Sequence, residues 1–249
     1  LFRSSGWTGT RRATDGFVLH GAELTAESPE VFRQDPGRMI RVFRILQDQG
    51  SVPGAELSAQ IRGNFSLMTE EWARRPDVRE NFLHILRQKG KVGRILRWMH
   101  ECGVLGRILP EFAPLTCLVQ HEFFHRYTAD EHTLVCLEQL DAMLDSKEPD
   151  LRKYGELYAR VEMPEILALA VLLHDTGKAE LTRNHEEIGA VHAAQVARRL
   201  GFRGRELALM TFLVDHHMTL GNFSRKNLDE AETIRAFARI VQEIGRAHV

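Results

Sequence analysis

The residues best suited to chemistry lie in the segment LLHDTGK at 172–178, where a histidine and an aspartate end an apolar run. His174 and Asp175 are adjacent, Gly177 can end the helix, and Lys178 follows it. A carboxylate desolvated at the end of a buried helix needs compensation for its charge. A divalent metal supplies this compensation. The alternative is a hydrogen-bonded His–Asp pair that caps the helix.

Histidine is concentrated in the same part of the chain. There are 12 histidines, and eight of them fall between His121 and His217. Scattered surface histidines are the simpler interpretation of any single one, but clustering favours a metal site because imidazole is the commonest transition-metal ligand. The further candidates are His132, His185, His192, His216 and His217.

Helical spacing reduces this set. His216 and His217 point about 100° apart on a helix, so only one of them can face an ion. His192 follows His185 by two turns, roughly 10 Å along the axis, which predicts a core or surface role for His192. The remaining ligands are imidazoles and a carboxylate. This mixed set indicates a site for Mg²⁺, Mn²⁺, Fe²⁺ or Zn²⁺ rather than a zinc site made of thiolates. They are numerous enough for one ion or for two.

The elements that must position these residues are helical. Residues 164–176 are apolar all round, which predicts a central helix. Residues 16–20 alone favour a strand, and the two prolines of 109–114 interrupt the helical pattern. We therefore predict an all-α fold. Its expected helices cover 37–49, 77–88, 91–102, 129–145, 164–176, 185–200, 204–218 and 228–242.

Composition narrows the partners and the compartment. The formal net charge is −1, which gives no sign of a nucleic-acid or membrane surface. No apolar run reaches the roughly 18 residues of a membrane span, and no signal peptide opens the chain. The three cysteines form no CxxC pair, so we expect a reducing cytoplasmic location with all three in the core.

The spaced pattern of a histidine followed by a His-Asp pair resembles the HD superfamily of metal-dependent phosphohydrolases. Five motifs follow one another along the chain, namely LPEF at 109–112, FFHRYTADEHTL at 123–134, LLHDTGK at 172–178, NHEEIGA at 184–190 and LVDHHMTL at 213–220. In order and spacing, these motifs are similar to the uridylyl-removing domain of the bifunctional PII uridylyltransferases. The earlier residues resemble the helical segment that links the transferase and hydrolase domains of that family.

The resemblance implies roles for matching residues. His132, His174 and Asp175 match the core metal ligands, while His185 and His217 match ligands of a second metal or of the phosphate. Asp175 and Lys178 are the implied catalytic residues, with Lys178 placed to meet a phosphate oxygen. The implied cofactor is a divalent metal, Mg²⁺ or Mn²⁺, and no other cofactor is expected.

The implied reaction is removal of UMP from the uridylylated PII signal protein, an activity of nitrogen regulation. A phosphohydrolase of free nucleotides and a non-catalytic metal-binding helical module are the alternatives. We expect no uridylyl transfer, because no Gly-Ser phosphate loop with paired aspartates occurs.

The resemblance also divides the chain. The expected organisation is a partial linking segment over 1–116 and an HD helical bundle over 117–242. That bundle is expected to be truncated before a later aspartate of the family. Residues 243–249 match a translated sequencing adapter and are expected to be non-biological.

Overall fold

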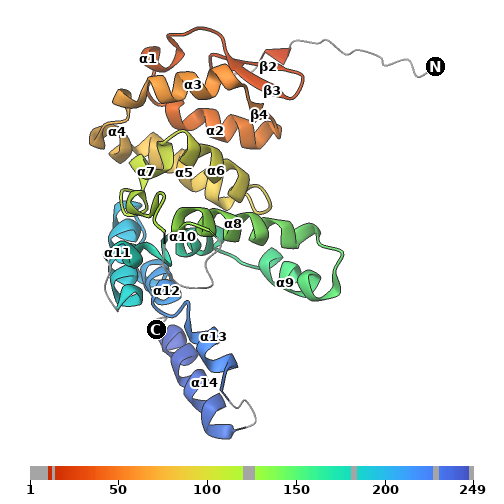
Figure 1. The fold of residues 1–249 in the computed structure, drawn as a ribbon, viewed down its shortest axis with the longest axis vertical. Helices are drawn as coiled ribbons and strands as arrows, with labels where there is room; N and C mark the ends of the chain where they lie inside the picture. Colours follow the sequence, from red (N-terminus) through yellow and green to blue (C-terminus); the bar gives the residue numbers. More distant parts are fainter. Residues whose placement is uncertain (1–10, 13–14, 120–126, 181–183, 227–229, 247–249) are drawn as a thin grey trace, which may run out of the picture. The chain divides into compact units, whose positions relative to one another are not determined.

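The computed structural model describes residues 11–12, 15–119, 127–180, 184–226 and 230–246, with side chains described from Asp15 to Gln242 within these ranges. The chain divides after Ile108 into two compact units. Helices dominate both units (Figure 1), which confirms the all-α fold class. The predicted domain boundaries and the interpretation of residues 243–249 stay predictions. Among the described helices, none combines the length and apolar character needed to cross a bilayer.

The first unit is built on three helices that were all predicted from apolar spacing. They are α2 (Arg38–Gln49), α5 (Pro76–Arg87) and α6 (Val92–Glu101), and they pack against one another. Shorter helices surround them, namely α1 (Val31–Gln34), α3 (Ala55–Gly63), η1 (Phe65–Leu67), α4 (Glu70–Arg74) and α7 (Val104–Ile108). The face of α2 that carries Met39, Ile40, Phe43 and Leu46 is buried, as its spacing predicts.

A small sheet accompanies these helices. Its strands follow the order β1 (Arg11–Arg12), β2 (Phe17–His20), β3 (Glu23–Ala26) and β4 (Val52–Pro53). The first three strands pair in antiparallel fashion, with Phe17 opposite Ala26, and β4 adds to β3 in parallel. Only β2 falls in the residues that favoured a strand. The others span two to four residues, too few to show a period of two.

An ion-pair network ties the start of the first unit to α2. Arg41 Nε lies 2.6 Å from Asp15 Oδ2, and Arg41 also pairs with Asp35. Burial alone would raise the pKa of Asp15 and of Asp35, but hydrogen bonds from Arg41 outweigh it and hold each pKa below the ordinary value. Both carboxylates therefore stabilise the fold in their charged form.

We expect Arg41→Met to lower the free energy of unfolding at pH 7 by about 1–2 kcal/mol, because it removes charged hydrogen bonds at a partly exposed site. The lowered pKa values mean that this stabilisation is present above about pH 4 and is lost as the pH falls through them. The difference from wild type should therefore shrink below pH 4 in urea denaturation curves. Arg33→Met, at an exposed pair with Glu30, is the control and should change little. An equal gap at pH 7 and pH 3 would contradict the argument.

The second unit surrounds α10 (Pro164–Leu173), which contacts α8 (Ala129–Ala142), α11 (His185–Arg199) and α12 (Gly204–Asp215). This central position follows from its apolar residues on every side, since Ile166, Leu169, Leu172 and Leu173 are all buried. The remaining elements are η2 (Ala113–Leu115), η3 (Met143–Asp145), α9 (Pro149–Ala159), η4 (Thr176–Glu180), α13 (Thr219–Ser224) and α14 (Ala231–Arg246).

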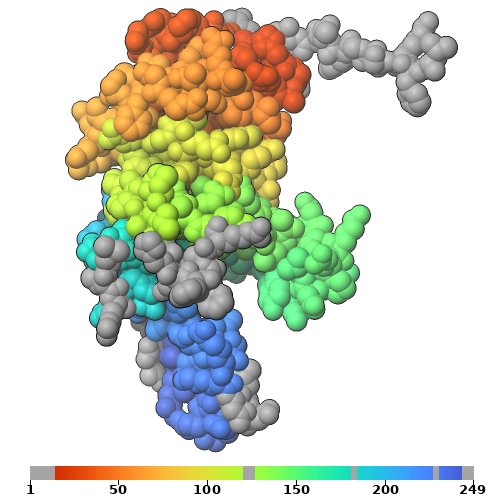
Figure 2. All heavy atoms as spheres, viewed as in Figure 1, coloured from red at the N-terminus to blue at the C-terminus, as the bar shows by residue number. Residues whose placement is uncertain are grey.

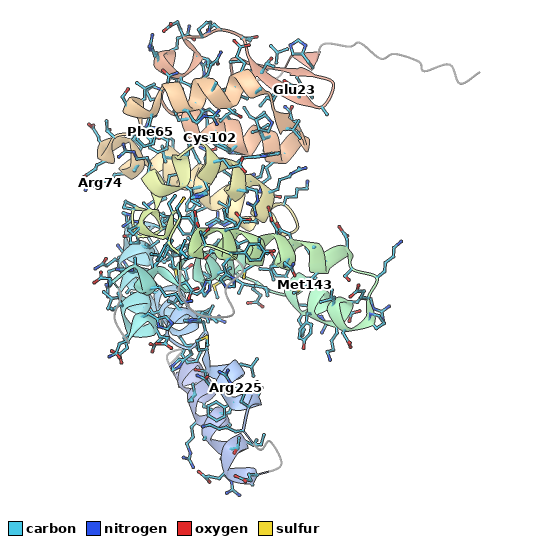
Figure 3. All side chains as sticks on the ribbon, in the orientation of Figure 1. Glu23, Phe65, Arg74, Cys102, Met143 and Arg225 are labelled. Carbon is cyan, nitrogen blue, oxygen red and sulfur yellow. The ribbon has the colours of Figure 1, made fainter. Side chains whose placement is uncertain are left out.

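Helix α9 was not predicted. It returns from η3 so closely that a Cβ at Gly155 would overlap the Met143 carbonyl oxygen. Figure 3 marks Met143 at this turn. Helix α9 belongs to the green part of Figure 2. The side chains of Leu151, Tyr154 and Leu157 remain exposed. Its apolar residues therefore do not form a buried stripe.

Candidate metal centre

The predicted site residues converge at the ends of four helices in the second unit. His132 lies in the first turn of α8, while His174 and Asp175 directly follow α10. His185 begins α11, and His217 comes just after α12. Because α10 packs against each of the other three helices, its last residues meet side chains from all of them.

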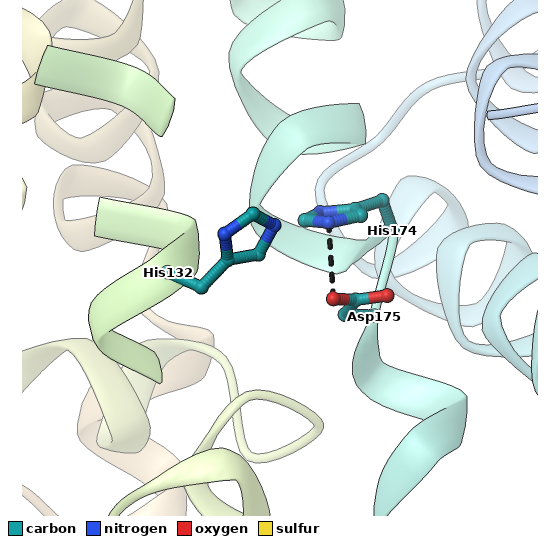
Figure 4. Close-up of side chains that lie close together, drawn as sticks. All are labelled: His132, His174 and Asp175. Carbon is teal, nitrogen blue, oxygen red and sulfur yellow. Dashed lines mark ion pairs between the residues drawn. The ribbon is translucent and has the colours of Figure 1, made fainter. Parts of the chain in front are cut away.

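The first cluster consists of His132, His174 and Asp175 (Figure 4). One ligand atom from each of them lies within 4.8 Å of the others. His174 Nε2 is 3.2 Å from Asp175 Oδ2, and the rings of His132 and His174 have centroids 5.6 Å apart. Two imidazoles and one carboxylate at this spacing can hold a divalent cation.

The second cluster shares Asp175 with the first. It combines Asp175 with His185 and His217, again with ligand atoms within 4.8 Å of one another. His217 Nε2 is 3.8 Å from Asp175 Oδ1, the oxygen that does not face His174. The two oxygens of one carboxylate thus face different histidines, so Asp175 could help to hold an ion at either cluster.

Two histidines are oriented by backbone carbonyls. His174 Nδ1 donates to the Val171 oxygen and His217 Nδ1 donates to the Val214 oxygen, both at 2.7 Å. Each ring therefore turns Nε2 toward Asp175, and in His217 the neutral ring has a lone pair there. His217 Nε2 is buried and has no hydrogen-bond partner among the described residues. Metal-binding histidines typically donate their other ring N–H in this way, so the residues fit a metal ion.

The charges of the site also suit a cation. Burial by itself would raise the pKa of Asp175, whose side chain is only 3% exposed, but hydrogen bonds from His174 and Lys178 hold that pKa well below its usual value. Burial lowers the pKa of His217, with the nearby His174 and His185 adding to the effect. A charged carboxylate therefore faces a neutral imidazole, and these are the protonation states of metal ligands.

The other candidates occupy different positions. Lys178 Nζ lies 2.8 Å from Asp175 Oδ2. His216 turns away from the clusters, since its ring packs on Phe212 and its Nδ1 lies 3.3 Å from Thr219 Oγ1. His192 Nδ1 lies 3.2 Å from Thr176 Oγ1. His121 and His125, together with the start of the FFHRYTADEHTL motif, fall outside the described residues.

The prediction that all three cysteines lie in the core holds for Cys102 but is wrong for the exposed Cys117 and for Cys136, which sequence reasoning did not place near the site. Cys136 is half-buried, and its Sγ lies 3.8 Å from His132 Nε2. The available signal was its position one helical turn after His132, which puts both side chains on the same face.

Gly177 was predicted only to end a helix, yet it also positions His185. A Cβ at Gly177 would overlap the carbonyl oxygen of His185 and approach the backbone nitrogen of Gly189. Helix α11 can therefore approach η4 only because residue 177 has no side chain.

We expect Gly177→Ala to destabilise the chain by about 1–3 kcal/mol, since the overlap is with backbone. It should also displace His185 and so weaken the binding of an ion at the cluster of Asp175, His185 and His217. Urea denaturation and the number of Mn²⁺ ions bound measure the two effects. Gly221→Ala is the matched control, because a Cβ there meets nothing within 4 Å. A Gly177→Ala chain with unchanged stability and ion count would overturn this account of the glycine.

Comparisons with known proteins agree with the division of the chain into two units. Residues 17–108 match the family model of the uridylyltransferase GlnD third domain, and residues 130–245 match that of the HD domain. The bifunctional uridylyltransferase/uridylyl-removing enzymes of Caulobacter vibrioides and Pseudomonas fluorescens are 33% and 34% identical over 236 residues. The alignments cover 93% and 91% of this chain but 25% and 26% of the relatives. The chain thus spans about a quarter of their length.

The helical bundle with its histidine and aspartate clusters is an HD domain, a class of domain that binds divalent metals and supports phosphohydrolase chemistry. The chain belongs to the family of the bifunctional uridylyltransferase/uridylyl-removing enzymes.

Proposed function

We propose that the second unit hydrolyses a phosphodiester and removes UMP from the uridylylated PII signal protein. The observation that carries this proposal is the buried Asp175 carboxylate, which lies between imidazoles of two clusters. Lys178 Nζ and His174 Nε2 lie 2.8 Å and 3.2 Å from Oδ2 of this carboxylate. The HD-domain match and the names of the relatives support the same reaction.

The metal-holding roles follow from the two clusters. We propose His132, His174 and Asp175 as ligands of one ion, and Asp175, His185 and His217 as ligands of a second. Mg²⁺ or Mn²⁺ suits this mixture of imidazole and carboxylate. When bound, such an ion lowers the pKa of a coordinated water and polarises a phosphate oxygen.

The remaining chemistry belongs to Asp175 and Lys178. The Asp175 carboxylate orients a water molecule beside the phosphorus and can take its proton. The Lys178 ammonium, with its side chain 19% exposed, is placed to offset the charge that builds on the phosphoryl oxygens. A tyrosinate leaving group departs more easily than an alkoxide, because the pKa of a tyrosine hydroxyl is ordinarily only about 10.

We propose that the reaction takes place in the reducing cytoplasm. The proposed partner is PII as the protein substrate, and neither nucleic acid nor a membrane is proposed as a partner. The three cysteines support a reducing compartment, because all of them are described and all are free thiols.

The test is to load the purified chain with Mn²⁺ and to follow UMP release from uridylylated PII beside an Asp175→Ala control. We expect UMP release that the control lacks. Hydrolysis of free nucleotides in place of uridylylated PII would identify another phosphohydrolase. Bound metal without any turnover would identify a non-catalytic module, and either result would overturn the proposal.

A further inference from the structure

A cavity of about 310 Å³ lies directly beside the two metal clusters. His174 and His217 form part of its wall, and the other lining residues include Cys136, Leu167, Val171 and Leu213. These residues come from α8, α10 and α12, which lie together in the second unit (Figure 1). The same two imidazoles thus face Asp175 and border the cavity. A phosphate held at the clusters would direct one of its ester groups into it.

The chemistry of the lining limits what that ester group can be. Apart from the two imidazoles and the thiol, the described side chains around the cavity are aliphatic. A second cavity of about 290 Å³ shares Leu167 and Leu213 with the first, and its wall adds the charged Glu162 and Arg205 to further apolar side chains. Buried polar groups without partners are costly, so a uracil ring with its carbonyl and N–H groups fits this lining poorly. A phenyl ring needs only apolar contact and fits it well.

We propose that this cavity is an aryl pocket, which holds the aromatic ring of the group that leaves the phosphate. The inference rests on the proposed function. It specifies in addition that the tyrosine of the substrate lies on the side of the metal centre where this cavity opens. It makes aryl phosphodiesters the preferred substrate class and leaves the nucleoside outside the cavity. The half-buried Leu167, Val171 and Leu213 have room for a ligand at their exposed edges.

Two non-hydrolysable probes that differ only in a ring isolate this effect. The Mn²⁺-loaded chain is titrated with phenylphosphonate and with methylphosphonate by calorimetry, and we expect phenylphosphonate to bind about tenfold more tightly. Leu167→Trp fills the cavity away from the proposed ligands, so it should remove the preference while methylphosphonate affinity stays the same. Val191→Trp, at an exposed position on α11 that does not line the cavity, should keep the preference.

Cys136 provides a second readout that locates the ligand. Phenylphosphonate should slow maleimide labelling of Cys136, as read by peptide mass spectrometry, whereas methylphosphonate should not. Labelling of the exposed Cys117 should not respond to either probe.

The outcomes separate the two proposals. Equal affinity for both phosphonates, or a preference that survives Leu167→Trp, would overturn the aryl pocket alone. Protection of Cys136 by UMP but not by phenylphosphonate would place the nucleoside in the cavity and also overturn it. If neither phosphonate binds the Mn²⁺-loaded chain, the proposed phosphate site fails and the pocket fails with it.

Discussion

Asp175→Asn is expected to lower kcat for UMP release by on the order of 10³-fold and to abolish tight Mn²⁺ binding. Asp175 is the one residue common to both clusters, and its two oxygens face different histidines. An amide of the same size carries no charge to balance a cation, and its NH₂ group would oppose an ion at one of the two positions. Enzyme kinetics and calorimetry measure the two losses.

The control for this substitution is Asp215→Asn. Asp215 is a carboxylate at the end of α12 whose side chain is 41% exposed and lies 3.8 Å from His216, outside both clusters. It should leave turnover and Mn²⁺ affinity near wild type. Circular dichroism should show both variants folded, since each change conserves volume. An Asp175→Asn chain that keeps a tenth of its activity would show that the carboxylate is not the centre of the site.

Lys178→Met is expected to lower kcat by about 10²-fold, because it removes a cation from the place where phosphoryl charge develops. It should not weaken Mn²⁺ binding. The ammonium lies 2.8 Å from Asp175 Oδ2 and competes with an ion for that oxygen, so Mn²⁺ should bind the variant several-fold more tightly. Steady-state kinetics measures the fall in kcat, and calorimetry measures the rise in Mn²⁺ affinity.

Lys153→Met, on α9 beside Tyr154, is the matched control for loss of a lysine. Weaker Mn²⁺ binding by Lys178→Met would mean that Lys178 holds Asp175 in place for the metal. Unchanged kcat would show that the ammonium does not meet the phosphate.

The helices and the shared position of most candidate residues could be predicted from sequence. The all-round apolar run at 164–176 predicts a central helix, and a central helix brings its last residues close to those of its neighbours. The prediction that only one of His216 and His217 faces the ion assumed a helix over 204–218, but α12 ends at Asp215. His217 nevertheless faces Asp175, while His216 packs on Phe212. The helix predictions succeed because they depend on the period of a single helix.

The features that the sequence did not reveal depend on contacts between distant segments. Asp175 takes part in both clusters because α8 and α11 begin, and α12 ends, around the last residues of α10. Gly177 resembles an ordinary helix terminator until α11 packs on its bare Cα. Cys136 lies among apolar residues in sequence, and its place in the wall of the cavity beside His174 is set by how α8 packs on α10.

The most direct test of the metal centre is anomalous X-ray diffraction from crystals of the chain soaked in Mn²⁺. We expect an anomalous peak bounded by His132, His174 and Asp175, with a second peak beside His185 and His217 if two ions bind. An absence of any peak at Asp175 in crystals that bind Mn²⁺ elsewhere would contradict the account.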